Sequence, residues 1–179
     1  MFFYQIVYKI NNETINKLFI IILGIDPGLA DMGYAFIEKN KSVLKSLKYG
    51  VIKTSSKLSL LERLLLIEKE LKNLIKTFKP SEVACESIFF FKNAKTAFLI
   101  GQIKGIILLI SAKQGLTINE YTPLQIKQSV ACYGRAEKQQ VQKMVQKLLN
   151  LKELPKPDHA SDAIACAICH AYSRKSLLN

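Results

Sequence analysis

The pattern of apolar and polar residues near the start of the chain predicts strands. Residues 19–25 form a continuous apolar run rich in isoleucine, which is typical of a strand buried on both faces. The run ends in an Asp-Pro-Gly turn signal at 26–28. Residues 33–37 and 49–52 have the composition of two further strands. The sequence therefore predicts three neighbouring strands joined by short connections.

A helical period replaces this pattern from residue 59 onward. Apolar side chains recur on one face of residues 59–78, lysine and glutamate lie opposite, and Pro80 ends the segment. The elements predicted after it are, in order, a strand at 83–86, a helix at 93–113, a strand at 116–121, a helix starting at Pro123, and helices at 138–149 and 159–172. The last helix is apolar nearly all round, so we expect it to be largely buried. This order indicates an α/β fold with a mixed sheet.

The length of the chain suits one domain. It has 179 residues, of which 49% are hydrophobic, and this is ample for a continuous core. We assign residues 18–175 to a single domain, residues 1–17 to an N-terminal extension of uncertain role and residues 176–179 to a tail. The extension lacks the features of a signal peptide, and no apolar run approaches the about 20 residues of a membrane span. The expected compartment is the cytoplasm, with no membrane partner.

The charge of the chain indicates a polyanionic partner. Lys and Arg number 26 against 14 Asp and Glu, which gives a formal net charge of +12. Such an excess favours nucleic acid or an anionic membrane surface, although a generally lysine-rich proteome would produce the same number. Cys166 and Cys169 form a C-x-x-C without a second pair, whereas zinc needs about four ligands. We therefore interpret these cysteines as small core residues.

Three carboxylates fall at the ends of predicted core elements. Asp26 ends the first strand, Glu86 ends the fourth, and Asp162 lies in the first turn of the last helix. Taken singly, they could be a turn residue, a solvated strand end and a partner of the helix dipole. Together they predict a site beyond the strand ends, because several carboxylates converge only with a cation between them. Oxygen ligands suit Mg²⁺ or Mn²⁺, and two such ions can promote hydrolysis of a phosphodiester.

The segment before Asp162 adds a histidine to this predicted site. His159 and Asp162 are three residues apart and share a helix face, as do Asp158 and Asp162, which are four apart. Asp158 also follows a proline and could cap the helix. We interpret Asp158 as the cap or a supporting group, and His159 as a metal ligand or general base. Whether Asp158 or His159 is the fourth active-site group stays open at this point.

An ordered series of motifs extends over almost the whole chain. Its members are Ile22-Leu23-Gly24-Ile25-Asp26-Pro27-Gly28, Glu86 followed by Phe89, Asn93 and Thr96-Ala97, then Glu120-Tyr121-Thr122-Pro123, Lys127-Gln128, Ala136-Glu137-Lys138, Gln140-Val141, Met144-Val145, Leu148-Leu149 and His159-Ala160-Ser161-Asp162-Ala163. This series resembles the RuvC family of Holliday junction resolvases. One Asp-Pro-Gly is a weak signal, but the ordered series is highly specific.

The resemblance implies an RNase H-like fold, with a mixed five-stranded sheet flanked by helices. It implies a homodimer that resolves four-way junctions by nicking two opposed DNA strands during recombination and repair, with two Mg²⁺ ions per site for which Mn²⁺ substitutes. The catalytic acids would map onto Asp26, Glu86 and Asp162, and the fourth position, Asp or His in the family, onto His159. A branch-migration motor complex is implied as a partner. Cys132 departs from the glycine usual at its position.

The loop after the fourth predicted strand and two later lysines are predicted to contact DNA. Three phenylalanines lie in that loop, and aromatic rings can stack on exposed bases for about 1–3 kcal/mol each; core or dimer contacts are the alternative. The resemblance singles out Phe89 for stacking. Lys92 could meet phosphates, and Lys127 and Lys138 match basic positions that the family uses on DNA. For the two later lysines, an ordinary solvated helix face is the alternative.

Two other functions fit part of the same pattern. Another RNase H-like nuclease, for example one acting on RNA–DNA hybrids, would keep the acids. A non-catalytic junction-binding protein would keep the lysines and phenylalanines but would not need the acids. Cleavage of junctions compared with cleavage of hybrids would separate these functions.

Overall fold

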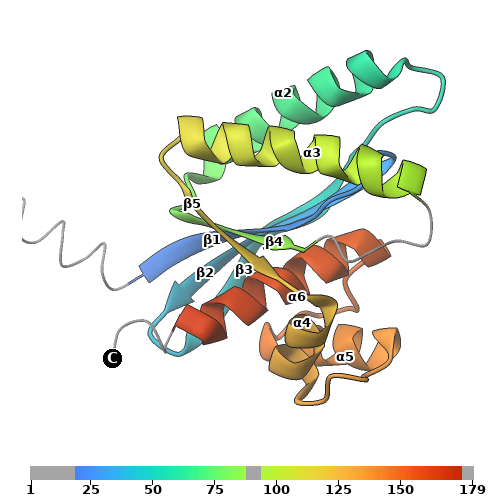
Figure 1. Cartoon of the computed structure of the whole chain (residues 1–179). Coiled ribbons are helices and arrows are strands. Elements are labelled where there is room, and N and C mark those ends of the chain that lie inside the picture. Colours follow the sequence, from blue (N-terminus) through green and yellow to red (C-terminus); the bar gives the residue numbers. More distant parts are fainter. Residues whose placement is uncertain (1–18, 88–93, 175–179) are drawn as a thin grey trace, which may run out of the picture.

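The predicted strands form one mixed sheet. The computed structural model describes residues 19–87 and 94–174, and within them the sheet has five strands (Figure 1): β1 (Phe19–Asp26), β2 (Asp31–Asn40), β3 (Val43–Lys53), β4 (Glu82–Glu86) and β5 (Thr117–Tyr121). Their spatial order is β3-β2-β1-β4-β5. β2 is antiparallel to both of its neighbours, while β4 is parallel to both β1 and β5.

Helices cover both faces of this sheet. They are α2 (Leu60–Phe78), α3 (Ala94–Lys113), α4 (Pro123–Ala131), α5 (Lys138–Leu148) and α6 (Asp158–Ser173). Figure 1 shows α2 and α3 on one face, and α6 on the other with α4 and α5 beside it. The predicted architecture, a mixed five-stranded sheet flanked by helices, is confirmed.

The central strand β1 is buried on both faces. Ile22 packs into the core that α6 completes, whereas Leu23 and Ile25 pack into the core formed with α2 and α3. Each of the three is 0% exposed. Because successive side chains of a strand point to opposite faces, an uninterrupted apolar run is what a strand between two helical layers requires.

Local sequence sets the ends of α2. The Ser59 hydroxyl accepts a hydrogen bond from the Glu62 backbone N–H, and the Glu62 carboxylate accepts one from the Ser59 backbone N–H. The helix ends at Lys79, which adopts a left-handed conformation with φ 46° directly before Pro80. The helix predicted from residue 59 to residue 78 is confirmed, with the first of these residues acting as the cap.

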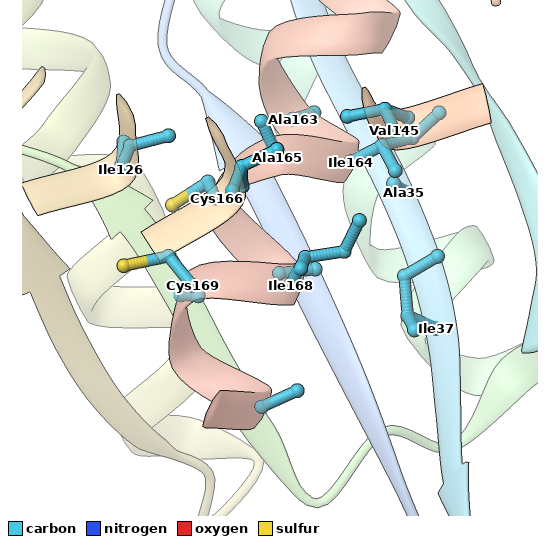
Figure 2. Close-up of a cluster of buried hydrophobic side chains, with 14 of the residues drawn as sticks. Ala35, Ile37, Ile126, Val145, Ala163, Ile164, Ala165, Cys166, Ile168 and Cys169 are labelled. Carbon is cyan, nitrogen blue, oxygen red and sulfur yellow. The ribbon is translucent and has the colours of Figure 1, made fainter. Parts of the chain in front are cut away.

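α6 approaches the sheet so closely that two glycines are required beneath it. A Cβ on Gly24 would lie 2.1 Å from the carbonyl oxygen of Ala163, and a Cβ on Gly33 would lie 2.0 Å from that of His159. Alanines, isoleucines and cysteines of α6 continue the contact toward β2, α4 and α5 (Figure 2). The absence of side chains at both glycines therefore lets the first turn of α6 reach the end of β1.

The C-x-x-C pair belongs to this same core. Cys166 and Cys169 are free thiols that are 0% and 1% exposed, and they lie among the apolar side chains in Figure 2. Their interpretation as small core residues is confirmed.

The predicted boundaries differ most from the structure for strands β2 and β3. β2 and β3 are longer than the strands predicted at 33–37 and 49–52. β3 is an edge strand whose polar and half-exposed side chains interrupt the apolar pattern, so its pairing with β2 decides its length. The predicted extension at 1–17 and tail at 176–179 lie outside the described residues.

Helix α3 has an apolar character that extends beyond its buried face. Ile103, Ile107 and Ile110 are buried against the sheet. By length and composition alone, the stretch Thr96–Lys113 could cross a membrane, a test that core helices also pass. Its packing over the sheet in Figure 1 is that of a covering helix.

Candidate active site

Three carboxylates converge at the edge of the sheet where the parallel strands β1 and β4 end. Asp26 is the last residue of β1 and Glu86 the last of β4. The pairing of Ile25 with Cys85 brings these two acids side by side. Asp162 arrives from the N-terminal part of α6, which the close packing on β1 and β2 directs to the same edge.

A histidine joins this acidic edge. His159 Nδ1 lies 2.7 Å from Asp26 Oδ2. Ligand atoms of Asp26, His159 and Asp162 all lie within 4.8 Å of one another, a spacing that one metal ion can bridge. Glu86 is outside this group of three but lines the same cleft as Asp162. The structure thus places the four predicted catalytic residues at a single edge.

Burial and mutual repulsion disfavour the ionised forms of the acids at this edge. Burial raises the pKa of Asp26 and outweighs the hydrogen bond from His159, which lowers it. The charge of Asp162 raises this pKa further. Burial, followed by the charges of Asp26 and Asp162, raises the pKa of Glu86 to about 7. Acids whose ionised forms are disfavoured in this way are stabilised by a cation among them. Carboxylate oxygens with one imidazole nitrogen fit Mg²⁺ or Mn²⁺.

A cleft with a volume of ≈ 240 Å³ opens beside Glu86 and Asp162. Lys127 of α4 and Lys138 of α5 line it, together with the apolar side chains of Pro123, Ile126, Val141 and Ala165. α4 begins at this cleft with a capping box between Thr122 and Gln125. Carboxylates that can hold cations and lysines that can bind phosphates therefore line the same cleft.

Lys138 reaches into the acidic cluster. Its Nζ lies 3.0 Å from Asp162 Oδ2 and 3.3 Å from Asp158 Oδ2. Asp158 is the first residue of α6, and Pro157 is the N-cap, so the interpretation of Asp158 as the helix cap is wrong. The Asp158 side chain turns toward α5 instead, where Gln142 Nε2 donates to its Oδ1 at 3.0 Å. This arrangement favours the alternative interpretation of Asp158 as a supporting group.

Gln142 is a member of the site that sequence reasoning missed. Lys138 and Gln142 are four residues apart on α5, as Asp158 and Asp162 are on α6, so each pair shares a helix face. The equal spacing of these two pairs is the feature of the sequence that could have pointed to Gln142. The sequence did not show that the two helices would face each other here.

The remaining predicted residues fall into two groups. Phe89 and Lys92 lie outside the described residues. Cys132 is the C-cap of α4 and has φ 56°. This left-handed conformation is the one in which glycine is usual after a helix.

A mixed sheet of this kind, with acids at the ends of its parallel central strands, is the arrangement of metal-dependent nucleases with an RNase H-like fold. The family model described as "Crossover junction endodeoxyribonuclease RuvC" matches residues 22–170. The chain belongs to this RuvC family of crossover junction endodeoxyribonucleases.

Individual relatives match nearly the whole described region. RuvC of Halothermothrix orenii is 52% identical over 153 residues, which cover 86% of this chain and 93% of that one. RuvC of Caldicellulosiruptor saccharolyticus is 52% identical over 158 residues, 88% of this chain and 95% of that one. The structure of Thermus thermophilus RuvC with a Holliday junction substrate has a TM-score of 0.83 at 34% identity, covering 88% of this chain and 96% of that one.

Membership of this family makes the chain an enzyme of crossover junction resolution. It confirms the RNase H-like fold and the nuclease activity that the motif series implied. The family is metal-dependent, and the cluster of Asp26, His159 and Asp162 accords with this. These relatives give no support to a hybrid-specific nuclease or to a non-catalytic junction-binding protein.

Proposed function

We propose that this chain resolves four-way DNA junctions during recombination and repair by nicking two opposed strands. Two Mg²⁺ ions, which Mn²⁺ can replace, would be held by Asp26, Glu86, His159 and Asp162. The supporting observation is that ligand atoms from three of these residues lie within 4.8 Å of one another, beside the fourth, whose pKa is raised to about 7. Paired divalent cations supply Lewis acidity and lower the pKa of water at such sites.

Each side chain has a distinct part in this proposal. Asp26 would help to hold both ions, because it contacts His159 directly, the charge of Asp162 acts on it, and its own charge acts on Glu86. The His159 Nδ1–H donates to Asp26, which orients the ring and leaves Nε2 for a cation or for a water proton. Glu86 and Asp162 would supply further carboxylate ligands. Hydrolysis by in-line attack of water then needs no covalent intermediate on the protein.

The lysines of the cleft bind the DNA backbone in this proposal. Lys127 and Lys138 line the cleft with Glu86 and Asp162, so a phosphate held by them would lie beside the acids. Phe89 and Lys92 follow β4 within a few residues and are proposed to stack on a base and to contact a phosphate. The solved relative from Thermus thermophilus is bound to a Holliday junction substrate, which supports junction DNA as the ligand.

The exposed face of α3 is the proposed surface for homodimer formation. Phe98 is 69% exposed and Leu109 is 55% exposed. They are eleven residues apart, so they lie on one helix face with Gly101 and Gly105, where added Cβ atoms would meet open space. An exposed apolar stripe of this kind suits contact with a second copy of the chain. A branch-migration motor complex as a further partner and the cytoplasm as the location are proposed on the resemblance to the family.

Cleavage of an end-labelled synthetic four-way junction tests the proposed function. We expect paired nicks on opposed strands that require Mg²⁺ or Mn²⁺, with little cutting of linear duplex or RNA–DNA hybrid of the same sequence. Equal nicking in excess EDTA would overturn the metal assignment. A preference for the hybrid would overturn the substrate assignment.

A further inference from the structure

Two helices present complementary pairs of side chains at the rim of the cleft. On α5, Lys138 and Gln142 are four residues apart, and on α6, Asp158 and Asp162 are four residues apart. Lys138 Nζ contacts both carboxylates, at 3.0 Å from Asp162 Oδ2 and 3.3 Å from Asp158 Oδ2. The second oxygen of Asp158 accepts a hydrogen bond from Gln142 at 3.0 Å. Both oxygens of Asp158 are thus occupied by α5.

The contact between Lys138 and Asp162 conflicts with metal binding by Asp162. An ammonium group and a divalent cation that share a carboxylate repel each other and compete for the same lone pairs. A lysine is a cation at neutral pH, so Lys138 needs another partner when a divalent cation occupies Asp162.

Asp158 has the properties of that partner and not those of a metal ligand. Its side chain is 63% exposed and lies outside the group of Asp26, His159 and Asp162. Lys138 contacts one of its carboxylate oxygens at 3.3 Å, and Gln142 donates a hydrogen bond to the other at 3.0 Å. Asp158 is already satisfied by groups of the protein, so it has no comparable need for a metal ion.

We propose that Asp158 is a positioning residue that holds Lys138 while Asp162 binds a divalent cation. This inference rests on the proposed function, in which Asp162 is a metal ligand. The ammonium moves from sharing both carboxylates to Asp158 alone, and Gln142 keeps that carboxylate turned toward α5. Lys138 then remains at the rim of the cleft, where a phosphate of the junction can meet it.

Binding of Mn²⁺ to the full chain without DNA, followed by the electron paramagnetic resonance signal of free Mn²⁺, tests this inference. Lys138→Met should tighten Mn²⁺ binding because the competitor is gone. Asp158→Asn should weaken it about 3- to 10-fold, the coupling expected of charges in direct contact, because Lys138 then has only Asp162. In the Lys138→Met background, Asp158→Asn should leave Mn²⁺ affinity unchanged.

The double variant separates positioning from simple attraction. If Asp158 merely attracted the metal by its charge, Asp158→Asn would weaken binding equally in both backgrounds, and that result would overturn the inference. An unchanged or weaker affinity in Lys138→Met would overturn it as well. Glu153→Gln and Lys143→Met are matched controls that remove one charge from the loop before α6 and from α5. We expect each of them to change Mn²⁺ affinity less than 2-fold, as for screened surface charges.

Failure of the proposed function gives a different result. If Asp26→Asn and Asp162→Asn both retain the Mn²⁺ affinity of the unaltered chain, the acidic edge is not the metal site and the proposed function falls. If those two variants lose affinity while the double variant shows no coupling, only the role of Asp158 is wrong.

Discussion

The two ends of strand β4 carry the same residue in opposite electrostatic surroundings. Glu82 and Glu86 are four residues apart on a strand, so both side chains point to the face covered by α6. The hydrogen bond from His170 and the charge of Arg174 lower the pKa of Glu82 despite its burial. Burial with Asp26 and other acids nearby raises the pKa of Glu86 to about 7. Cationic and hydrogen-bonding groups of the protein balance the charge at one end of the strand, whereas at the other end neighbouring acids disfavour it.

The two histidines of the chain repeat this contrast along α6. His170 is 1% exposed, and its ring nitrogens lie 2.6 Å from Glu82 Oε2 and 2.6 Å from the Tyr121 hydroxyl oxygen. His159 has a side chain that is 49% exposed, and it contacts Asp26 through one nitrogen. A histidine satisfied on both sides in the core serves packing and hydrogen bonding. A histidine with one nitrogen open beside several acids is available for chemistry.

The largest expected effect is a difference between substitutions of Asp26, at the acidic edge, and of Glu82, at the other end of β4. Asp26→Asn should lower junction cleavage on the order of 10²–10³-fold, the usual effect of removing one group that stabilises the transition state electrostatically. It should keep junction binding, and its thermal stability in EDTA should rise because a buried charge is removed. Glu82→Gln should keep cleavage per folded molecule and unfold at a lower temperature. Junction cleavage at the normal rate by Asp26→Asn would show that the acidic edge is no more important for catalysis than the Glu82 end of β4.

The next effect is a pH dependence of opposite sign at the two ends of β4. Glu86, with an ordinary pKa of 4.5 and a folded pKa of about 7, contributes stability that is full below pH 4.5 and lost as pH rises through 7. The loss should reach about 3 kcal/mol in EDTA, since one pKa unit is about 1.4 kcal/mol. Mg²⁺ should restore the stability at high pH. Glu82, whose pKa is lowered, contributes stability that is present above its ordinary pKa and lost in acid.

Urea unfolding measures both contributions when it is extended from about pH 3, where that of Glu82 is lost, to about pH 8, where that of Glu86 is lost. The free energy of unfolding of Glu86→Gln in EDTA should depend on pH less than that of the unaltered chain. Identical pH profiles for the two proteins would show that Glu86 does not carry the raised pKa.

The smallest of the expected effects separates the histidines. His170→Ala should lower the free energy of unfolding by about 2 kcal/mol, because it removes a buried ring and its hydrogen bond to a partly buried carboxylate. His159→Ala should cost less, about 1 kcal/mol, because it removes the hydrogen bond to Asp26 from a half-exposed ring and no core packing, and it should reduce cleavage. Chemical denaturation and junction cleavage of both variants provide the two readouts. Loss of stability in His159→Ala with normal cleavage would reverse the assignment.

The sequence carried much of the fold, for identifiable reasons. The apolar run of β1 is interrupted by no polar residue, and the serine and glutamate at the start of α2 form a capping box, so both elements could be predicted locally. The length of β3 could not be predicted in this way, because its polar side chains do not alternate cleanly. The pairing of β3 with β2 defines that length. Asp158 was misjudged as a possible cap because its partner lies on another helix.

The sequence by itself determined which elements form and which of their ends carry acids, because periodicity, caps and turns act over a few residues. Only the tertiary structure decided which charges balance. The pairing of Glu82 with His170 and Arg174, and of Lys138 with Asp158, joins residues from separate elements. Electrostatic energy depends on distance in space and on burial, and neither is set by spacing along the chain.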